Sequence, residues 1–214
     1  MLRLYSIFRS IQGESTWAGL PCVFVRLAGC PLNCVYCDTR GAAESEGKEV
    51  SIEEVLLELD RLSTPLVEVT GGEPMVQVDT LPLLERLVDR GITVLLETSG
   101  AFDLNAVNVR VRKIVDVKCP DSGENSSFLP ENISYLQRGR DEVKFVISSE
   151  ADFVFAVDFC RRHSLFDKAE LLISPVGGLV SLEEAAKWIL ETSLPLRLQP
   201  QLHKLIWPFE KGER

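Results

Sequence analysis

Residues 22–39 of the chain read CVFVRLAGCPLNCVYCDT. The first six are mostly apolar and predict a strand, and a loop of glycine, proline and three cysteines follows at once. The same order, an apolar strand and then a polar or glycine-rich loop, returns where loops begin at Thr70, Glu97, Asp116 and Ser174. Because parallel strands end at one rim of a sheet or barrel, these five loops predict a single pocket.

The segments between these strands indicate an α/β fold. Residues 51–62 and 181–190 each open with Ser-x-x-Glu, the pattern of a helix-capping box, and continue with apolar residues at helical spacing. Further helices are expected at 81–88 and 151–161, and strands at 2–8, 22–27, 66–69, 92–96, 113–117, 143–147 and 171–173. This alternation is typical of βαβ units with a parallel sheet.

About six such units are too few for a closed eight-stranded barrel of roughly 250 residues. We therefore expect a shortened, open, partial barrel of the (βα)6 type. It should form one domain over residues 1–214, with a cysteine loop at 29–40 and a C-terminal closing segment at 195–214.

Composition and charge narrow the class of protein. The net charge of −9 over 214 residues creates a field that repels phosphate backbones, so no nucleic-acid partner is expected. No apolar run approaches the roughly 18 residues of a membrane span, and the N-terminus does not resemble a signal peptide. We therefore expect no membrane association and a cytoplasmic location. Six clustered cysteines in such a compartment indicate metal or redox ligands rather than disulfides.

The strongest local signal is the C-x-x-x-C-x-x-C spacing of Cys30, Cys34 and Cys37. Gly29, Pro31 and Asn33 supply the turns that let such a short loop wrap one centre. Structural zinc takes four closed ligands, whereas three thiolates suit a 4Fe–4S cluster with one iron left open. The alternative is a zinc site with an unidentified fourth ligand. Cys22 and Cys160 are expected to be buried small residues, and Cys119 to line the pocket rim.

This spacing, with Tyr36 before the third cysteine and Gly-Gly-Glu-Pro at 71–74 after a strand, resembles the radical S-adenosylmethionine (SAM) superfamily. The resemblance implies that the open iron binds the amino and carboxylate groups of SAM. It further implies that reduction releases a 5′-deoxyadenosyl radical, and that Glu73 receives the methionyl ammonium group.

Motifs outside that core narrow the resemblance further. Ser-Ile-Gln-Gly-Glu at 10–14, Cys-Asp-Thr at 37–39, Glu-Thr-Ser-Gly at 97–100 and Gln-Leu-His-Lys at 201–204 occur in the order seen in 7-carboxy-7-deazaguanine synthases. The resemblance implies a carbon–nitrogen lyase that contracts the ring of 6-carboxy-5,6,7,8-tetrahydropterin with loss of ammonia. It also implies Mg²⁺, a reducing protein such as flavodoxin or ferredoxin, a homodimer, and a product that feeds queuosine or another 7-deazapurine of tRNA modification.

The resemblance also implies roles for individual residues. The pterin contacts are Ile11, Gln12, Gly13, Glu14, Arg26, Thr70 and His203. The SAM contacts are Tyr36, Cys37, Asp38, Gly72, Glu73, Ser99, Lys118 and Ser174. The metal ligands are Cys30, Cys34 and Cys37 for the cluster and Thr39 for Mg²⁺.

Physical chemistry supports several of these roles and leaves alternatives beside them. The planar fork of Arg26 suits a bidentate carboxylate, although an interstrand salt bridge is the simpler role. The Thr39 hydroxyl is a weak oxygen ligand of the kind Mg²⁺ accepts, although it can also cap a turn. Gly72 would let the backbone approach SAM closely. Ser99 stands where the family more often has asparagine, and the chain continues through 208–214 where several relatives stop.

Two other functions share the cysteine pattern. A glycyl-radical activating enzyme can be equally short, and a non-catalytic iron–sulfur or zinc scaffold would use the same thiols. The Gln-Gly-Glu, Cys-Asp-Thr and Gln-Leu-His-Lys segments favour the synthase over the activating enzyme. The scaffold differs from both in predicting no reductive cleavage of SAM.

Overall fold

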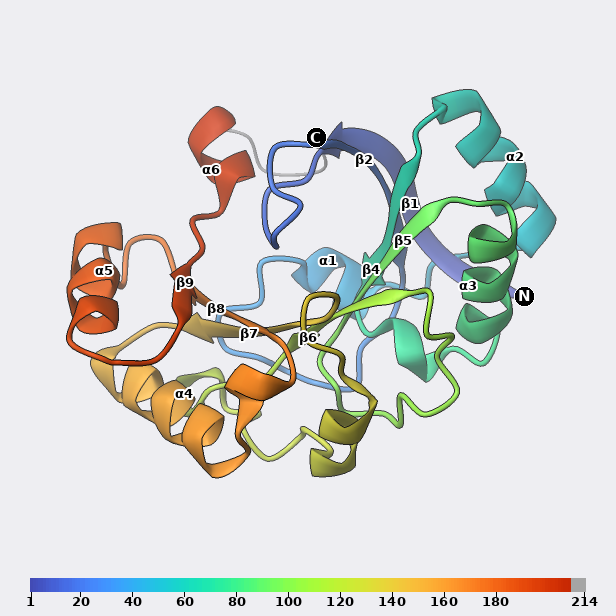
Figure 1. Cartoon of the computed structure of the whole chain (residues 1–214). Coiled ribbons are helices and arrows are strands. Elements are labelled where there is room, and N and C mark those ends of the chain that lie inside the picture. Colours follow the sequence, from blue (N-terminus) through green and yellow to red (C-terminus); the bar gives the residue numbers. More distant parts are fainter. Residues whose placement is uncertain (209–214) are drawn as a thin grey trace.

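The computed structural model describes residues 1–208, which form a curved sheet with helices along its outer side (Figure 1). Its nine strands in that part of the chain follow the order β3-β1-β2-β4-β5-β6-β7-β8-β9, and the two edge strands do not pair. The strands are β1 (Leu2–Ile11), β2 (Pro21–Leu27), β3 (Lys48–Val50), β4 (Leu66–Gly71), β5 (Thr93–Thr98), β6 (Arg112–Asp116), β7 (Glu142–Ile147), β8 (Glu170–Pro175) and β9 (Leu196–Leu198). The prediction of an open, partial barrel is confirmed.

The strand directions differ from the prediction at one edge. Every pair of adjacent strands in the series β2-β4-β5-β6-β7-β8-β9 is parallel, as expected. In contrast, β1 is antiparallel to both β2 and β3. Residues 12–20 between β1 and β2 are too few for the crossover of a dozen or more residues that a parallel pair needs. The chain therefore turns back as a hairpin before the parallel units begin.

The helices confirm the four that the sequence predicted and add two short ones. They are α1 (Arg40–Glu44), α2 (Ile52–Leu62), α3 (Thr80–Asp89), α4 (Glu150–Arg162), α5 (Leu182–Leu190) and α6 (Leu202–Ile206). Capping boxes are present at Ser51 and Ser181, as their Ser-x-x-Glu patterns predict. Strands β5 and β6 are followed by loops and 3-10 turns instead of α-helices, so the βα alternation is incomplete.

Alternation along the strands sorts side chains between two faces. On β4, Val67 and Val69 point to the large core beneath the helices, while Leu66, Glu68 and Thr70 occupy alternate positions on the concave face. The same alternation holds on the neighbouring strands. The concave face therefore collects every second residue of the parallel strands.

An apolar floor closes one end of this concave face. It consists of Cys22, Phe24, Leu66, Leu95 and Ile114, with Phe8 and Trp17 packed against it. Trp17 comes from the hairpin loop and lies under the guanidinium group of Arg112, 4.9 Å from the ring centroid. The Thr16 amide donates to the Glu142 carboxylate at 3.1 Å, which anchors the same loop. The hairpin tip thus plugs the amino-terminal end and leaves the carboxyl-terminal end open.

Within residues 1–208, none of the helices is both long enough and apolar enough to cross a membrane. The segment 209–214, which includes most of the C-terminal extension and the end of the predicted closing segment, lies outside the described residues.

Candidate active site

A cavity of about 560 Å³ opens at the carboxyl ends of the parallel strands, which is the size of an ordinary small-molecule site. All seven residues predicted to contact the pterin line it, namely Ile11, Gln12, Gly13, Glu14, Arg26, Thr70 and His203. Of the predicted SAM contacts, the cavity is lined by Tyr36, Cys37, Asp38, Gly72, Ser99 and Lys118. The metal ligands Cys30, Cys34, Cys37 and Thr39 line it too. The single pocket that the strand ends predict is therefore present.

Backbone contacts on both sides fix the cysteine loop. The Cys30 amide donates to the Ala43 carbonyl at 3.1 Å, and the Val35 amide donates to the Ser122 carbonyl at 3.0 Å. The Arg40 guanidinium group donates to the Cys34 carbonyl at 3.0 Å. These bonds hold three thiols along one wall of the cavity.

The donor set fits an iron–sulfur cluster. All three cysteines are free thiols, and they share a cavity that extends well beyond them. Burial raises the pKa of the Cys30 and Cys34 thiols, while the ammonium group of Lys118 opposes that rise and favours the thiolates that a metal needs. Among residues 1–208, no three His, Cys, Asp or Glu side chains converge as a cage for a metal ion. A cluster takes its thiolates on separate irons, so its ligands need not converge on one point.

The glycine-rich loop after β4 packs directly against the start of the cysteine loop. A Cβ atom on Gly72 would lie 2.1 Å from the Gly29 carbonyl oxygen, and the Glu73 amide donates to that same oxygen at 2.9 Å. The chain's own backbone thus already excludes a side chain at Gly72 and sets the two loops against each other. Close approach of SAM at this glycine stays a prediction.

Glu73 is placed differently from the prediction. Its side chain is buried and does not line the cavity. Its carboxylate accepts hydrogen bonds from the Thr98 hydroxyl at 2.7 Å, from both the amide and the hydroxyl of Ser99, and from the Met75 amide. With these acceptor positions occupied, the carboxylate joins the ends of β4 and β5.

Two further residues lie behind the cavity wall. Ser174 was predicted to border SAM and Cys119 to line the rim, yet both are fully buried and neither lines the cavity. Cys119 packs in the large core, where burial raises its thiol pKa. Ser174 lies on β8, and the cavity is lined instead by Val146 of the adjacent strand and by Val176 beyond the end of β8. Cys22 and Cys160 are buried, as predicted.

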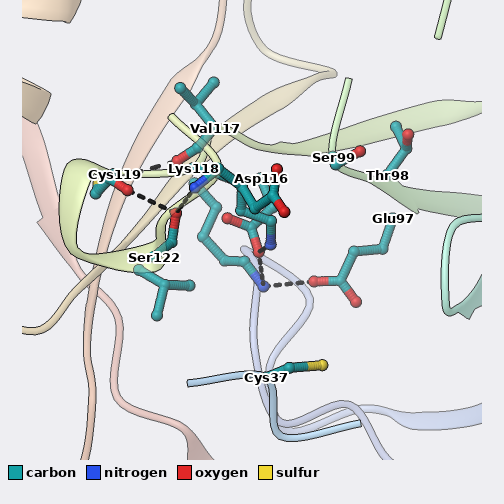
Figure 2. A network of polar contacts seen from close by, with 12 residues as sticks. Cys37, Glu97, Thr98, Ser99, Asp116, Val117, Lys118, Cys119 and Ser122 are labelled. Carbon is teal, nitrogen blue, oxygen red and sulfur yellow. Dashed lines mark hydrogen bonds and ion pairs between the residues drawn. The ribbon is translucent and has the colours of Figure 1, made fainter. Parts of the chain in front are cut away.

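Two further predicted SAM contacts, Tyr36 and Lys118, are fixed by hydrogen bonds to neighbouring residues. The Tyr36 hydroxyl donates to the Val146 carbonyl at 3.0 Å, and the Lys118 ammonium group donates to Asp116 at 2.9 Å. Burial lowers and the Asp116 carboxylate raises the pKa of Lys118, and the net result is above its ordinary value. Figure 2 shows Asp116, Lys118 and Glu97 on the sheet side, and Cys37 on the separate cysteine loop below them in this view.

A layer of mostly buried charge lies just above the apolar floor, and the sequence motifs gave no role to two of its members, Glu68 and Lys144. The residues are Glu68, Glu97, Asp116 and Lys144, and all four line the cavity. The Lys144 ammonium group donates to Glu14 at 2.8 Å and to Glu97, and it lies 3.8 Å from Asp116. The available signal was a single charged residue inside each of two otherwise mostly apolar strands, Glu68 in Val-Glu-Val-Thr and Lys144 in Val-Lys-Phe-Val.

Glu68 holds the Gln-Gly-Glu segment in place through a side-chain hydrogen bond from Gln12. The Gln12 amide nitrogen donates to the Glu68 carboxyl group, and the Gln12 amide oxygen accepts the backbone N–H of Glu14 at 3.1 Å. Burial and then the Glu97 charge raise the pKa of Glu68 well above its ordinary range, against the opposing effects of Gln12 and Lys144. The carboxyl group of Glu68 therefore keeps its proton to a higher pH than an ordinary glutamate does.

The C-terminal helix α6 lies beside the hairpin loop that carries the Gln-Gly-Glu segment (Figure 1), and a backbone hydrogen bond joins the two. The Leu202 amide donates to the Gly13 carbonyl at 2.8 Å, and a Cβ atom on Gly13 would lie 2.2 Å from Nδ1 of His203. The side-chain amide of Gln201 donates to the Glu14 carboxylate at 2.8 Å, and the Lys204 ammonium group donates to the Asp38 carboxylate at 3.1 Å. The tail thereby joins the predicted pterin side to the predicted SAM side.

Comparison with known proteins defines the class first. A family model described as the radical SAM superfamily matches residues 25–116. Among solved structures, QueE from Escherichia coli has a TM-score of 0.77 with 23 % identity and 94 % of each chain covered. SuiB from Streptococcus suis has a TM-score of 0.58 with 16 % identity, and the match covers 87 % of this chain and 51 % of that one. Together with the cysteine loop, these matches define a radical SAM enzyme, a class that carries a 4Fe–4S cluster and SAM.

Curated relatives then define the family. The 7-carboxy-7-deazaguanine synthase of Koribacter versatilis is 44 % identical over 99 % of this chain and 100 % of its own length. That of Chlorobaculum tepidum is 43 % identical over 96 % of this chain and 94 % of its own length. The chain belongs to the 7-carboxy-7-deazaguanine synthase family.

Proposed function

We propose that this protein converts 6-carboxy-5,6,7,8-tetrahydropterin to 7-carboxy-7-deazaguanine, with loss of ammonia and with Mg²⁺ as an additional cofactor. The observation that carries the proposal is that three cysteine thiols and the Gln-Gly-Glu segment line the same cavity. The family to which the chain belongs supports the same assignment.

When bound, the cluster and SAM supply a 5′-deoxyadenosyl radical that removes a hydrogen atom from the substrate. Cys30, Cys34 and Cys37 would hold the cluster. Tyr36 and Lys118 border the same end of the cavity, so they are suited to contact SAM. Because the Glu73 carboxylate is already saturated, the backbone around Gly72 is the better candidate for the second SAM motif.

On the substrate side, the chain offers groups that match a carboxylated pterin. The Arg26 guanidinium group lies 5.7 Å above the Phe8 ring on the concave face and suits the substrate carboxylate. Gln12 and Glu14 present amide and carboxylate groups suited to the donors and acceptors of the pterin edge. Thr70 and His203 complete the set of predicted contacts.

Thr39 is the proposed Mg²⁺ ligand. Its hydroxyl lies 3.8 Å from the Cys37 sulfur and donates a long hydrogen bond of 3.4 Å to the Gly71 carbonyl. Such a weakly held hydroxyl between the two motif loops suits a metal that keeps most of its waters and shares substrate oxygens.

The cellular setting is part of the proposal. We propose a cytoplasmic homodimer that receives electrons from a flavodoxin- or ferredoxin-like protein and supplies queuosine or another 7-deazapurine of tRNA modification. The low reduction potentials that such chemistry requires fit a reducing compartment.

The test is anaerobic reconstitution followed by product analysis. The protein with its cluster rebuilt should consume the pterin in the presence of SAM, reductant and Mg²⁺, and release a deazapurine chromophore and ammonia. A variant with Cys34→Ala is the matched control, since it retains every proposed pterin contact. Cleavage of SAM without any deazapurine would overturn the substrate assignment while leaving the enzyme class intact.

A further inference from the structure

Lys144 on β7 is the most heavily engaged side chain of the cavity. Only 5 % of its side chain is exposed, and it points to the concave face above the apolar floor. Its ammonium group donates to Glu14 at 2.8 Å and to Glu97, and Asp116 lies 3.8 Å away. One nitrogen atom therefore contacts carboxylates from the hairpin loop, β5 and β6.

Each of the two bonded carboxylates leads on to a proposed pterin contact. Glu97 accepts the Thr70 hydroxyl at 3.1 Å, which orients that side chain at the end of β4. The backbone of Glu14 donates to the Gln12 side chain, and its carboxylate accepts the Gln201 amide at 2.8 Å. The Gln-Gly-Glu segment, the end of β4 and the C-terminal helix thus share one charged anchor.

The chemistry of lysine suits this position. An ammonium group has three donors in a compact tetrahedron and no acceptor, so it can bond carboxylates that arrive from different strands. Glu14 and Glu97 carry like charges and would repel each other in a buried site without it. Two of the three donors are engaged within the chain and Asp116 lies near the third, so Lys144 is placed to orient other groups rather than to bind substrate itself.

A second buried lysine provides a matched comparison. Lys113 on β6 is 3 % exposed and pairs with Asp141 at 3.0 Å. It does not line the cavity. The two lysines share burial and ionic pairing, but only Lys144 connects to residues of the proposed substrate site.

We propose that Lys144 is a positioning residue that fixes Glu14 and Glu97, and through them Gln12 and Thr70, in the geometry that binds the pterin. This inference rests on the proposed function. It adds to that function a residue that the sequence motifs do not contain.

The test is anaerobic equilibrium dialysis of the carboxylated tetrahydropterin against the reconstituted enzyme, with SAM present and reductant omitted so that no turnover occurs. The variants are K144M and K144R, with K113M and K113R as controls, and circular dichroism checks that each is folded. We expect K144M to raise the pterin Kd by roughly 10- to 100-fold, the equivalent of one charge-assisted hydrogen bond. K144R should raise it less, because its planar fork retains the charge without the tetrahedral geometry. The Lys113 variants should keep the wild-type Kd even where their melting temperature falls.

A wild-type Kd in folded K144M overturns the inference, as does an equal weakening in the Lys113 variants, which would indicate general destabilisation. If K144M does not fold, K144R decides, and a Kd within about twofold of wild type overturns the inference. If the wild-type enzyme itself fails to bind the pterin, the proposed function fails, and the inference that rests on it fails with it.

Discussion

Gly13 is the point where the C-terminal tail seats on the hairpin loop, and alanine at this position should lift the tail. The added Cβ atom would lie 2.2 Å from Nδ1 of His203 and 3.0 Å from the His203 backbone nitrogen. Ordinary contact needs about 3.5 Å, so the imidazole ring must retreat by more than about 1 Å. The hydrogen bond from the Leu202 amide to the Gly13 carbonyl would be strained in the same movement.

This displacement should weaken the docking of the C-terminal tail and reduce turnover. Overpacking of this kind costs about 1–3 kcal/mol, which should appear as weaker docking of the tail. A shift of about 1 Å in groups that line a binding site can cost up to roughly 100-fold in turnover. We therefore expect G13A to raise the pterin KM by about tenfold or more and to make the chain easier to cleave with trypsin after Lys204.

A control variant and a rescue variant separate displacement of the tail from general destabilisation of the protein. Gly177→Ala places its Cβ atom in open space on a loop outside the cavity, so kinetics and proteolysis should not change. Adding His203→Ala to G13A removes the ring that clashes, so protection from trypsin should return even though a proposed pterin contact is lost. Wild-type KM and wild-type proteolysis in G13A would refute the assigned seating of the tail.

Three other predictions concern single groups. Glu68→Gln should reduce the loss of folding stability that wild type shows as the pH rises. The pKa of Glu68 is raised in the folded state, so between the unfolded-state and folded-state pKa values the folded protein holds a proton that the unfolded chain has lost. Across that pH range wild type should lose up to about 1.4 kcal/mol of stability per pH unit. Melting temperatures followed from about pH 5 to about pH 8 measure this difference, and parallel curves for the two proteins would contradict it. Thr39→Ala should raise the Mg²⁺ concentration needed for half-maximal turnover while SAM still binds, and Thr39→Ser should restore it; an unchanged Mg²⁺ dependence would show the metal assignment to be wrong. Cys34→Ala should abolish both the iron–sulfur absorbance and reductive cleavage of SAM, and cleavage that persists in this variant would exclude Cys34 as a ligand.

The parts of the fold that could be predicted are those where local pattern and packing agree. Helix α2 has a capping box, an apolar stripe and 11 residues, so its sequence alone marks both ends closely. Helix α6 and strand β9 have 5 and 3 residues, too few for a period to develop, and they exist because the tail packs on β8 and the hairpin loop. The sequence predicts no helix between the strands at 92–96, 113–117 and 143–147, and the structure has no α-helix there.

In the candidate site, too, some features could be predicted from the sequence and others could not. Motifs located the cavity, since residues at the ends of parallel strands must converge whatever their side chains are. They did not show how each side chain is used, because that depends on neighbours far along the chain. Glu73 belongs to the motif, yet donors from Thr98 and Ser99 saturate it. Lys144 belongs to no motif, yet it holds two carboxylates of the cavity wall.

The distribution of charge in the cavity explains why an acidic protein suits a substrate that carries a carboxylate. The net charge of −9 acts at long range and is screened by salt, whereas the cavity wall is balanced group by group. Lys144 balances Glu14 and Glu97, and Lys118 balances Asp116. The raised pKa of Glu68 favours its neutral form more than in an ordinary glutamate, which lessens the need for a further cation. Since these partners are fixed before any ligand arrives, a bound carboxylate meets oriented donors and requires little rearrangement of the wall. Preorganisation of this kind depends on the bonds between wall residues, and therefore residues that never touch the substrate should control its affinity.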